Sequence, residues 1–263
     1  MEYMRGWRAL RADQEWTGKL MIGSLLFFST AIIPIVGQVA LAGWLTLAMR
    51  RAVSGQDSPL PHLALDFSYL GKLMSVGFKA FLVRMIWSLP IIAVAMLFGC
   101  CMYLGVFASV AGIGAATEGS GDTGAAVGGI GMVVLMLVGF VLYFVAIVLI
   151  SLPLQMAVLR AELTDDLNAG MRFGEVMAMT KMMLKELIVG QLVLSAISTG
   201  IALLGMMACY VGIFPAAVVI SVIHAYYLAE IYKAYLAKGG QPLPVGPLDV
   251  EGGNLGMSQP VAF

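Results

Sequence analysis

Residues 125–152 read AAVGGIGMVVLMLVGFVLYFVAIVLISL, and no side chain in this stretch carries a charge. A helix needs about 20 predominantly apolar residues to cross the hydrocarbon core of a bilayer. The stretch exceeds that length and lies between a glycine-rich acidic loop at 117–124 and Pro153. It therefore predicts a membrane-spanning helix.

The rest of the chain has the same character. Of its 263 residues, 60% are hydrophobic and 11% are charged, whereas soluble domains carry about 25% charged residues. A soluble fold of this size would leave too much apolar surface in water. Because the apolar residues are also grouped in long uncharged runs, the sequence predicts an all-α integral membrane protein.

The apolar runs predict about six membrane-inserted helices, at 20–33, 36–50, 85–115, 125–152, 187–211 and 215–232. The first two come from one block, which as a single helix would be about 45 Å long and too long for a hydrocarbon core of about 30 Å. Pro34 and Gly37 indicate a helix break inside that block, and Pro215 indicates a break in the last one. The first pair either crosses fully or forms a short re-entrant hairpin.

Amphipathic segments between the spans predict interfacial helices. At residues 2–19, apolar side chains recur at three-residue steps with arginines between them, which suits the headgroup layer. Similar patterns occupy 65–80 and 160–186. We expect residues 1–237 to form a single membrane domain. Residues 238–263 are rich in glycine and proline and predict a mobile cytoplasmic tail.

The basic residues predict the orientation of the chain. With the six spans above, all fifteen lysines and arginines lie on one side of the membrane or at its edge. The outer loops then hold only Glu118 and Asp122 as charged residues. Treating 20–50 as one crossing would move Lys72 and Lys79 to the outer side. Because basic loops stay in the cytoplasm, both termini are predicted to be cytoplasmic.

Three polar side chains in the apolar runs are candidates for a functional role: His224, Gln38 and Gln191. An ionisable group inside a membrane span is a functional candidate by default. The simpler interpretation of His224 is a neutral side chain that bonds Tyr227, Ser221 or a backbone carbonyl. The simpler interpretation of the glutamines is hydrogen bonding between helices.

Small residues give the helix at 125–152 a flat surface at its beginning, where Gly124, Gly128 and Gly131 follow one another at short intervals. Helices in lipid associate through close backbone approach rather than through burial of leucine against leucine. These three glycines are therefore a predicted packing seam, either within the chain or with a partner.

Several short motifs resemble the domain of unknown function 4013 family of prokaryotic polytopic membrane proteins. They are Trp16-x-x-Lys19-Leu20, Ile33-Pro34-Ile35-Val36-Gly37, Ala42-Gly43-Trp44, Arg50-Arg51, Gly55, Leu60-Pro61 before Asp66-Phe67, Phe173-Gly174-Glu175 and His224-x-x-Tyr227. The family position before Asp66 often carries tryptophan in a Leu-Pro-x-Trp-x-Asp pattern, which this chain lacks. The resemblance covers most of residues 7–235 and implies the prokaryotic cytoplasmic (inner) membrane, without assigning any chemistry.

Three function classes remain after these observations. A net charge of zero gives no basic surface for nucleic acid, and no motif for a catalytic, metal or cofactor site is present. We therefore expect a non-enzymatic protein, an accessory or structural subunit of a larger membrane complex or an organiser of lipid. Its expected partners are membrane lipid and another membrane protein or a second copy of itself. The alternative is a small transporter or lipid-handling protein, and an intramembrane enzyme is the weakest class.

Overall fold

The computed structural model describes residues 2–30, 32–33, 35–116, 122–208 and 211–250. For residue 106, and for most helical residues between 108 and 135, it describes the backbone alone. The described residues form helices and connecting segments, with no β-strand among them. The helices are α1 (Arg5–Ala12), α2 (Trp16–Ser29), α3 (Val36–Val53), α4 (Phe67–Ala116), α5 (Asp122–Thr164), α6 (Leu167–Met171), α7 (Phe173–Met182), α8 (Leu184–Met207) and α9 (Ile213–Ala237).

Four of the described helices are long and apolar enough to cross a membrane. The qualifying segments are Phe67–Gly105 in α4, Met136–Thr164 in α5, and the whole of α8 and α9. This confirms the all-α class and indicates a membrane protein. By the same measures α2 and α3 do not qualify, so the count of about six inserted helices and the re-entrant hairpin stay predictions.

The block at 20–50 is divided into two helices, as predicted. Helix α2 ends at Ser29 and α3 begins at Val36. Pro34, the predicted break, lies outside the described residues. The second predicted break falls between α8 and α9, and Pro215 lies in the first turn of α9. Proline is tolerated there because the first N–H groups of a helix have no intrahelical partner.

Two predicted helix boundaries are wrong, one between residues 80 and 85 and one at Pro153, whereas Pro90 was expected inside a helix. The interfacial helix before residue 80 and the span from 85 are one continuous helix, α4, which runs through Pro90. Helix α5 likewise continues through Pro153 to Thr164. An internal proline removes one backbone hydrogen bond, whereas ending the helix would leave several backbone groups to satisfy in an apolar environment.

Two of the three predicted interfacial segments, 2–19 and 160–186, are divided into shorter helices. The helix expected at 2–19 is interrupted between Ala12 and Trp16, because the Asp13 side chain accepts a hydrogen bond from the backbone N–H of Glu15 at 2.8 Å. The segment 160–186 contains the end of α5, then α6 and α7, then the start of α8. Asp166 separates α5 from α6 and caps α6 by accepting from the Asn168 backbone N–H.

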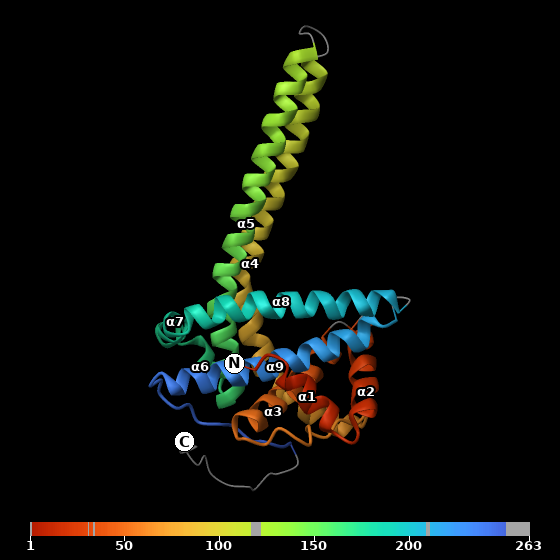
Figure 1. Cartoon of the computed structure of the whole chain (residues 1–263), viewed down its shortest axis with the longest axis vertical. Coiled ribbons are helices and arrows are strands. Elements are labelled where there is room, and N and C mark those ends of the chain that lie inside the picture. Colours follow the sequence, from red (N-terminus) through yellow and green to blue (C-terminus); the bar gives the residue numbers. More distant parts are fainter. Residues whose placement is uncertain (1, 31, 34, 117–121, 209–210, 251–263) are drawn as a thin grey trace. The chain divides into compact units, whose positions relative to one another are not determined.

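Contacts divide the chain into two units, Met1–Met85 with Gln155–Phe263, and Ile86–Leu154. Helix α9 is the centre of the first unit, where α1, α2, α3 and α8 all pack against it (Figure 1). Gly6 brings α1 close to α9, since a Cβ at this position would lie 2.9 Å from the Ile223 Cα. Gly43 of α3 and Gly77 of α4 make a second close crossing, where either Cβ would meet the backbone of the opposite helix.

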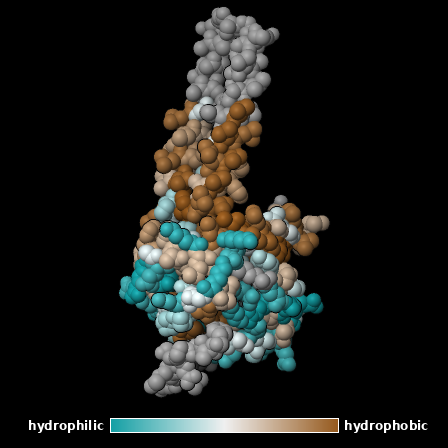
Figure 2. Space-filling view, turned by 60° about the vertical axis from the view of Figure 1, so that its left-hand side comes forward, coloured by the Kyte–Doolittle hydropathy of each residue, from teal (hydrophilic) through white to brown (hydrophobic). Residues whose placement is uncertain are grey.

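The second unit is a two-helix hairpin made from the end of α4 and most of α5, which run side by side (Figure 1). Phe98 stacks on Tyr143 with ring centroids 4.4 Å apart, and Gly139 leaves room for the Phe98 ring. In Figure 2, hydrophobic residues cover most of the part of this hairpin that is not drawn in grey. Gly124, Gly128 and Gly131 are helical residues of α5, but the surface they form lies outside the described side chains.

Part of the segment predicted to be a mobile tail makes hydrogen bonds with the rest of the first unit, and the mobility of residues 238–263 stays a prediction. The Leu243 N–H donates to the Tyr232 hydroxyl at 2.7 Å, and the Gly246 N–H donates to the carbonyl oxygen of Leu163 at 2.7 Å. Backbone groups thus hold part of this glycine- and proline-rich segment without requiring apolar side chains of its own. Residues 251–263 lie outside the described residues.

Candidate functional site

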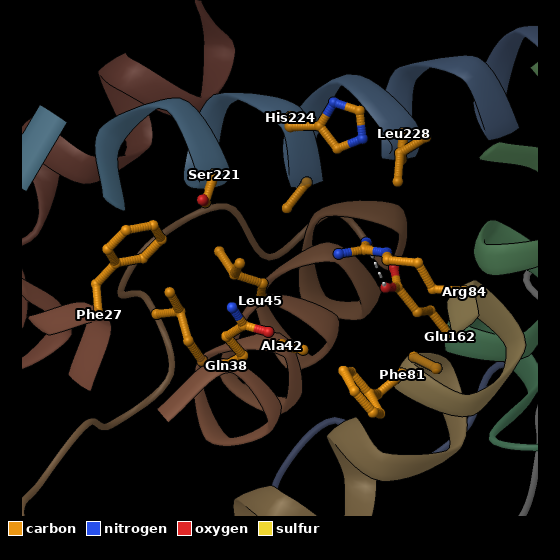
Figure 3. A pocket seen from close by; sticks show the side chains of 13 residues that line it. Phe27, Gln38, Ala42, Leu45, Phe81, Arg84, Glu162, Ser221, His224 and Leu228 are labelled. Atoms are coloured by element: carbon orange, nitrogen blue, oxygen red, sulfur yellow. Dashed lines mark ion pairs between the residues drawn. The ribbon is translucent and has the colours of Figure 1, made fainter. Parts of the chain in front are cut away.

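A cavity of about 300 Å³ lies inside the first unit, between α9 and the helices packed around it (Figure 3). Five helices line it: α2, α3, α4, α5 and α9. Its lining residues are Phe27, Gln38, Leu41, Ala42, Leu45, Ala80, Phe81, Arg84, Glu162, Ser221, His224, Ala225 and Leu228. This volume is at the lower end of the range for small-molecule pockets.

Helical spacing explains why these residues face the cavity. The α3 contribution falls at 38, 41, 42 and 45, and the α9 contribution at 221, 224, 225 and 228. Both sets follow the i, i+3, i+4, i+7 pattern of one helical face. Gly37 allows α3 to approach α2, since a Cβ there would meet the carbonyl oxygen of Leu26. The role of Gly37 in the structure is therefore close packing at the start of α3.

The charged part of the cavity is an ion pair between Arg84 of α4 and Glu162 of α5. The guanidinium Nη2 lies 3.8 Å from the carboxylate Oε1, too far for a hydrogen bond. Glu162 is only 7% exposed, whereas the Arg84 side chain is 54% exposed. Within the described residues, the Glu162 carboxylate accepts no hydrogen bond, and only this longer contact with Arg84 and the Coulombic attraction of Arg50 balance its charge. Such incomplete pairing is unusual for a buried carboxylate.

The backbone at Glu162 is held from the opposite side by Arg50 of α3. The Arg50 Nε donates to the Glu162 carbonyl oxygen at 2.6 Å, and Arg50 is 1% exposed. Its other nitrogens reach Asp165 at 3.1 Å and the carbonyl oxygen of Pro247 at 3.0 Å. Arg50 thus connects α3, the end of α5 and the tail, and it positions the residue whose side chain enters the cavity.

The polar groups on the α9 side of the cavity carry no net charge in their ordinary state. The Ser221 hydroxyl donates to the carbonyl oxygen of Ala217 at 2.8 Å. The His224 ring lies 6.1 Å from the Tyr227 ring, centroid to centroid. Figure 3 shows His224 on the α9 wall and Gln38 on the α3 wall of the same space. The cavity therefore combines one cation, one anion and neutral polar groups with apolar walls.

The structure brings together two of the three polar candidates predicted from the sequence. His224 and Gln38 line the cavity, whereas Gln191 lies elsewhere and accepts a hydrogen bond from the Gln155 amide at 2.6 Å. The Gln155–Gln191 contact between α5 and α8 matches the simpler interpretation of a bond between helices. A functional role for any of the three stays a prediction.

Sequence reasoning missed the two charged residues of the cavity. Arg84 directly precedes the span predicted from 85, where a basic residue is expected at the membrane edge. Glu162 lies among several charges at 160–186 and was grouped with an interfacial helix. The available signal was the position of Arg84, the last charged residue before the long uncharged run that ends at Glu118. No periodic pattern connects it with Glu162.

The helices and the cavity describe an all-α membrane protein with a small, partly charged internal site. A family match supports this class: the family described as "Protein of unknown function (DUF4013)" matches residues 26–211, and the chain belongs to it. The matched region includes Phe27, Gln38, Arg84 and Glu162 of the cavity, and it ends before α9. No curated protein and no solved structure matches the chain.

Proposed function

We propose that the chain is a non-enzymatic integral membrane protein that serves as an accessory or structural subunit of a larger membrane complex. The observation that carries this proposal is the hairpin at Ile86–Leu154, whose described side chains are all uncharged. Glu118 and Asp122 are its only charged residues in the sequence. Several of its large apolar side chains are more than half exposed, among them Met96, Leu97, Leu104, Leu137, Leu142 and Phe144.

A hairpin of this kind is suited to association rather than to conduction. Ion-coupled carriers generally need charged or basic groups near the middle of the membrane, and residues 86–117 and 123–154 contain no Asp, Glu, Lys, Arg or His. Its apolar faces match lipid or another transmembrane helix equally well, so a stable protein contact requires close backbone approach. Gly99 and Gly105 offer such approach, because a Cβ at either position would meet nothing within 4 Å.

The prokaryotic inner membrane, with both termini in the cytoplasm, is part of the same proposal. Its support is the placement of every lysine and arginine on one side when the six predicted spans are assumed. The non-enzymatic assignment is supported by the Ser221 hydroxyl, which donates to Ala217 on its own helix. It is thus not arranged as a nucleophile with His224 as its base.

The test is purification of the full chain in mild detergent, followed by identification and quantification of the proteins that co-migrate. Replacing both Gly99 and Gly105 by leucine is expected to remove the partner while leaving thermal stability unchanged. Gly139→Leu is the matched control, since it enlarges a residue that contacts Phe98 inside the hairpin and should lower stability instead. Gly128→Leu extends the test to the glycine seam predicted from the sequence.

Two results would overturn the subunit proposal. The first is a complex that survives the double glycine substitution and Gly128→Leu unchanged. The second is a stable, partner-free monomer that moves a solute or a lipid in vesicles, which would support the transporter or lipid-handling alternative. The cavity with Arg84 and Glu162 favours that alternative, because it offers a place for a small polar ligand.

A further inference from the structure

The Arg84–Glu162 pair has unused binding capacity on both sides. A guanidinium offers five N–H donors and a carboxylate about four acceptor positions, but their contact at 3.8 Å uses none of these in a hydrogen bond. Glu162 is more than nine-tenths buried and lines the cavity, without a donor among the described residues. A buried carboxylate in this condition is costly unless a ligand or water supplies donors.

The balance of charge restricts what the ligand can be. A simple anion at Arg84 would be placed next to the Glu162 carboxylate, and a simple cation at Glu162 would be placed next to the guanidinium. Like charges at that distance oppose binding. A ligand that carries one positive and one negative group satisfies both residues at once and keeps the site neutral.

The exposure of the two residues sets the order of the ligand's groups. Glu162 is buried and Arg84 is half exposed, so the positive group lies deeper and the negative group lies nearer to the opening. Apolar side chains of the lining, including Phe27, Leu45, Phe81 and Leu228, suit carbon atoms that follow the charged groups. A volume of about 300 Å³ accommodates a headgroup-sized ligand and not a whole lipid.

We propose that this cavity binds a primary ammonium–phosphate zwitterion, with the ammonium donating to Glu162 and the phosphate accepting from Arg84. The headgroup of phosphatidylethanolamine has this chemistry, and so does soluble phosphoethanolamine. Three N–H donors of a primary ammonium match the unsatisfied carboxylate, whereas a quaternary ammonium has no N–H to donate. The site lies wholly within the first unit, and the inference does not depend on the subunit proposal.

The test compares ligands that differ in one group. The full chain in mild detergent is titrated with short-chain phosphatidylethanolamine, phosphatidylcholine and phosphatidylglycerol, and separately with phosphoethanolamine. Binding is followed by thermal shift and by native mass spectrometry. We expect phosphatidylethanolamine to bind about tenfold more tightly than the choline and glycerol lipids, the ratio that loss of one charge-assisted hydrogen bond produces. Equal binding of all three lipids would overturn the proposal.

Titration with phosphoethanolamine distinguishes a soluble ligand from a lipid headgroup as the source of the ammonium–phosphate zwitterion. Binding of phosphoethanolamine as tightly as the lipid identifies a soluble ligand, and binding of the lipid alone identifies the membrane as the source. Both results support the site. Saturable binding of phosphatidylglycerol in preference to phosphatidylethanolamine would show a plain anion site and would contradict the role given to Glu162.

Charge-removing variants connect the binding with the two residues. Glu162→Gln and Arg84→Gln are each expected to weaken phosphatidylethanolamine binding about tenfold or more. Glu15→Gln and Lys72→Gln are the matched controls, because they remove the same charges at exposed positions outside the cavity. Ala42→Phe keeps both charges and fills the space, so it should also prevent binding. Unchanged binding in all three cavity variants would overturn the assignment.

Discussion

The ammonium nitrogen of Lys19 lies 2.7 Å from the carboxylate Oδ2 of Asp13, and both side chains are almost completely buried. The pair shares a direct hydrogen bond, unlike the ion pair in the cavity. Lys19 also donates to the carbonyl oxygen of Leu60 at 3.0 Å, and the Leu60 N–H donates to Asp13 at 2.8 Å. The pair thus joins the turn between α1 and α2 to the loop that precedes α4.

Removing one partner of this pair should destabilise the protein strongly. Lys19→Met leaves the Asp13 carboxylate buried without its counter-ion, and we expect a loss of about 3 kcal/mol in the free energy of unfolding. The measurement is thermal or denaturant unfolding in detergent. Glu15→Gln is the control, since Glu15 is exposed and 3.9 Å from Lys19, and it should change stability by less than about 1 kcal/mol. Equal stability of the Lys19→Met variant and the wild type would contradict this role.

The same pair predicts a dependence of stability on pH. Burial alone would raise the pKa of Asp13, but hydrogen bonds from Lys19 and from the backbone N–H groups of Glu15 and Leu60 hold it below its ordinary value. A carboxyl whose pKa is lowered by folding stabilises the folded state above its unfolded pKa of about 3.9, and this stability is lost as pH falls through the folded value. The melting-temperature difference between wild type and Asp13→Asn should therefore be full at neutral pH and shrink below about pH 4. A difference that grows on acidification would contradict the prediction.

The close crossing of α3 and α4 predicts opposite effects for two glycines. A side chain at Gly43 would meet the backbone carbonyl of Leu73, so Gly43→Ala should destabilise by about 1–3 kcal/mol. Gly71 lies in the same helix α4 with nothing within 4 Å of its Cβ position, and Gly71→Ala should be neutral or stabilising by up to about 1 kcal/mol. The free energy of unfolding of both variants is measured under one condition, and a Gly43→Ala variant as stable as the wild type would contradict the close crossing.

The docked part of the tail should be needed for stability, and the residues after it should not. A chain ending after Val250 keeps the backbone contacts that Arg50 and Tyr232 make with the tail. A chain ending after Gly240 loses them and exposes Arg50, so its free energy of unfolding should fall by about 1–3 kcal/mol. Melting temperatures of the two shortened chains against the full chain provide the measurement. Equal melting of all three chains would show that the docking contributes little.

The orientation of the chain can be tested at two serines. Ser58 and Ser120 should label from opposite sides when each is replaced by cysteine in a background without the native cysteines, because the loop at 53–80 is predicted to be cytoplasmic and the loop at 117–124 to be outside. A membrane-impermeant maleimide applied to intact cells and to inverted vesicles makes the comparison. Labelling of both positions from one side would disprove the predicted topology.

Local patterns were sufficient to predict most of the helices, but the helix end predicted at Pro153 is wrong. Pro34 and Pro215 were read as breaks, and helices do end near them. Pro90 and Pro153 lie inside continuous helices. A proline in the first turn of a helix costs little, whereas an internal one removes a backbone hydrogen bond. Whether a helix continues through an internal proline therefore depends on whether neighbouring segments favour a straight rod or a turn. That information is held in tertiary contacts.

The candidate site was predicted only in part for a similar reason. His224 and Gln38 stand out because each is polar within an apolar run, which is a local property. Arg84 and Glu162 are ordinary residues at the edge of a span until the fold places them 3.8 Å apart. They form a candidate site because Glu162 is buried and lies close to Arg84, and the spacing of the two residues in the sequence predicts neither the burial nor the distance.

The sequence by itself determined that this chain is helical and belongs in a membrane, because long uncharged apolar runs leave a backbone few alternatives in lipid. Only the tertiary structure decided which residues meet. Arg50 contacts Glu162 from 112 positions away, and Arg51 contacts Leu248 from 197 positions away. Contacts of that range depend on how the faces of α3, α5 and α9 pack, and helical periodicity specifies a face without specifying its partner.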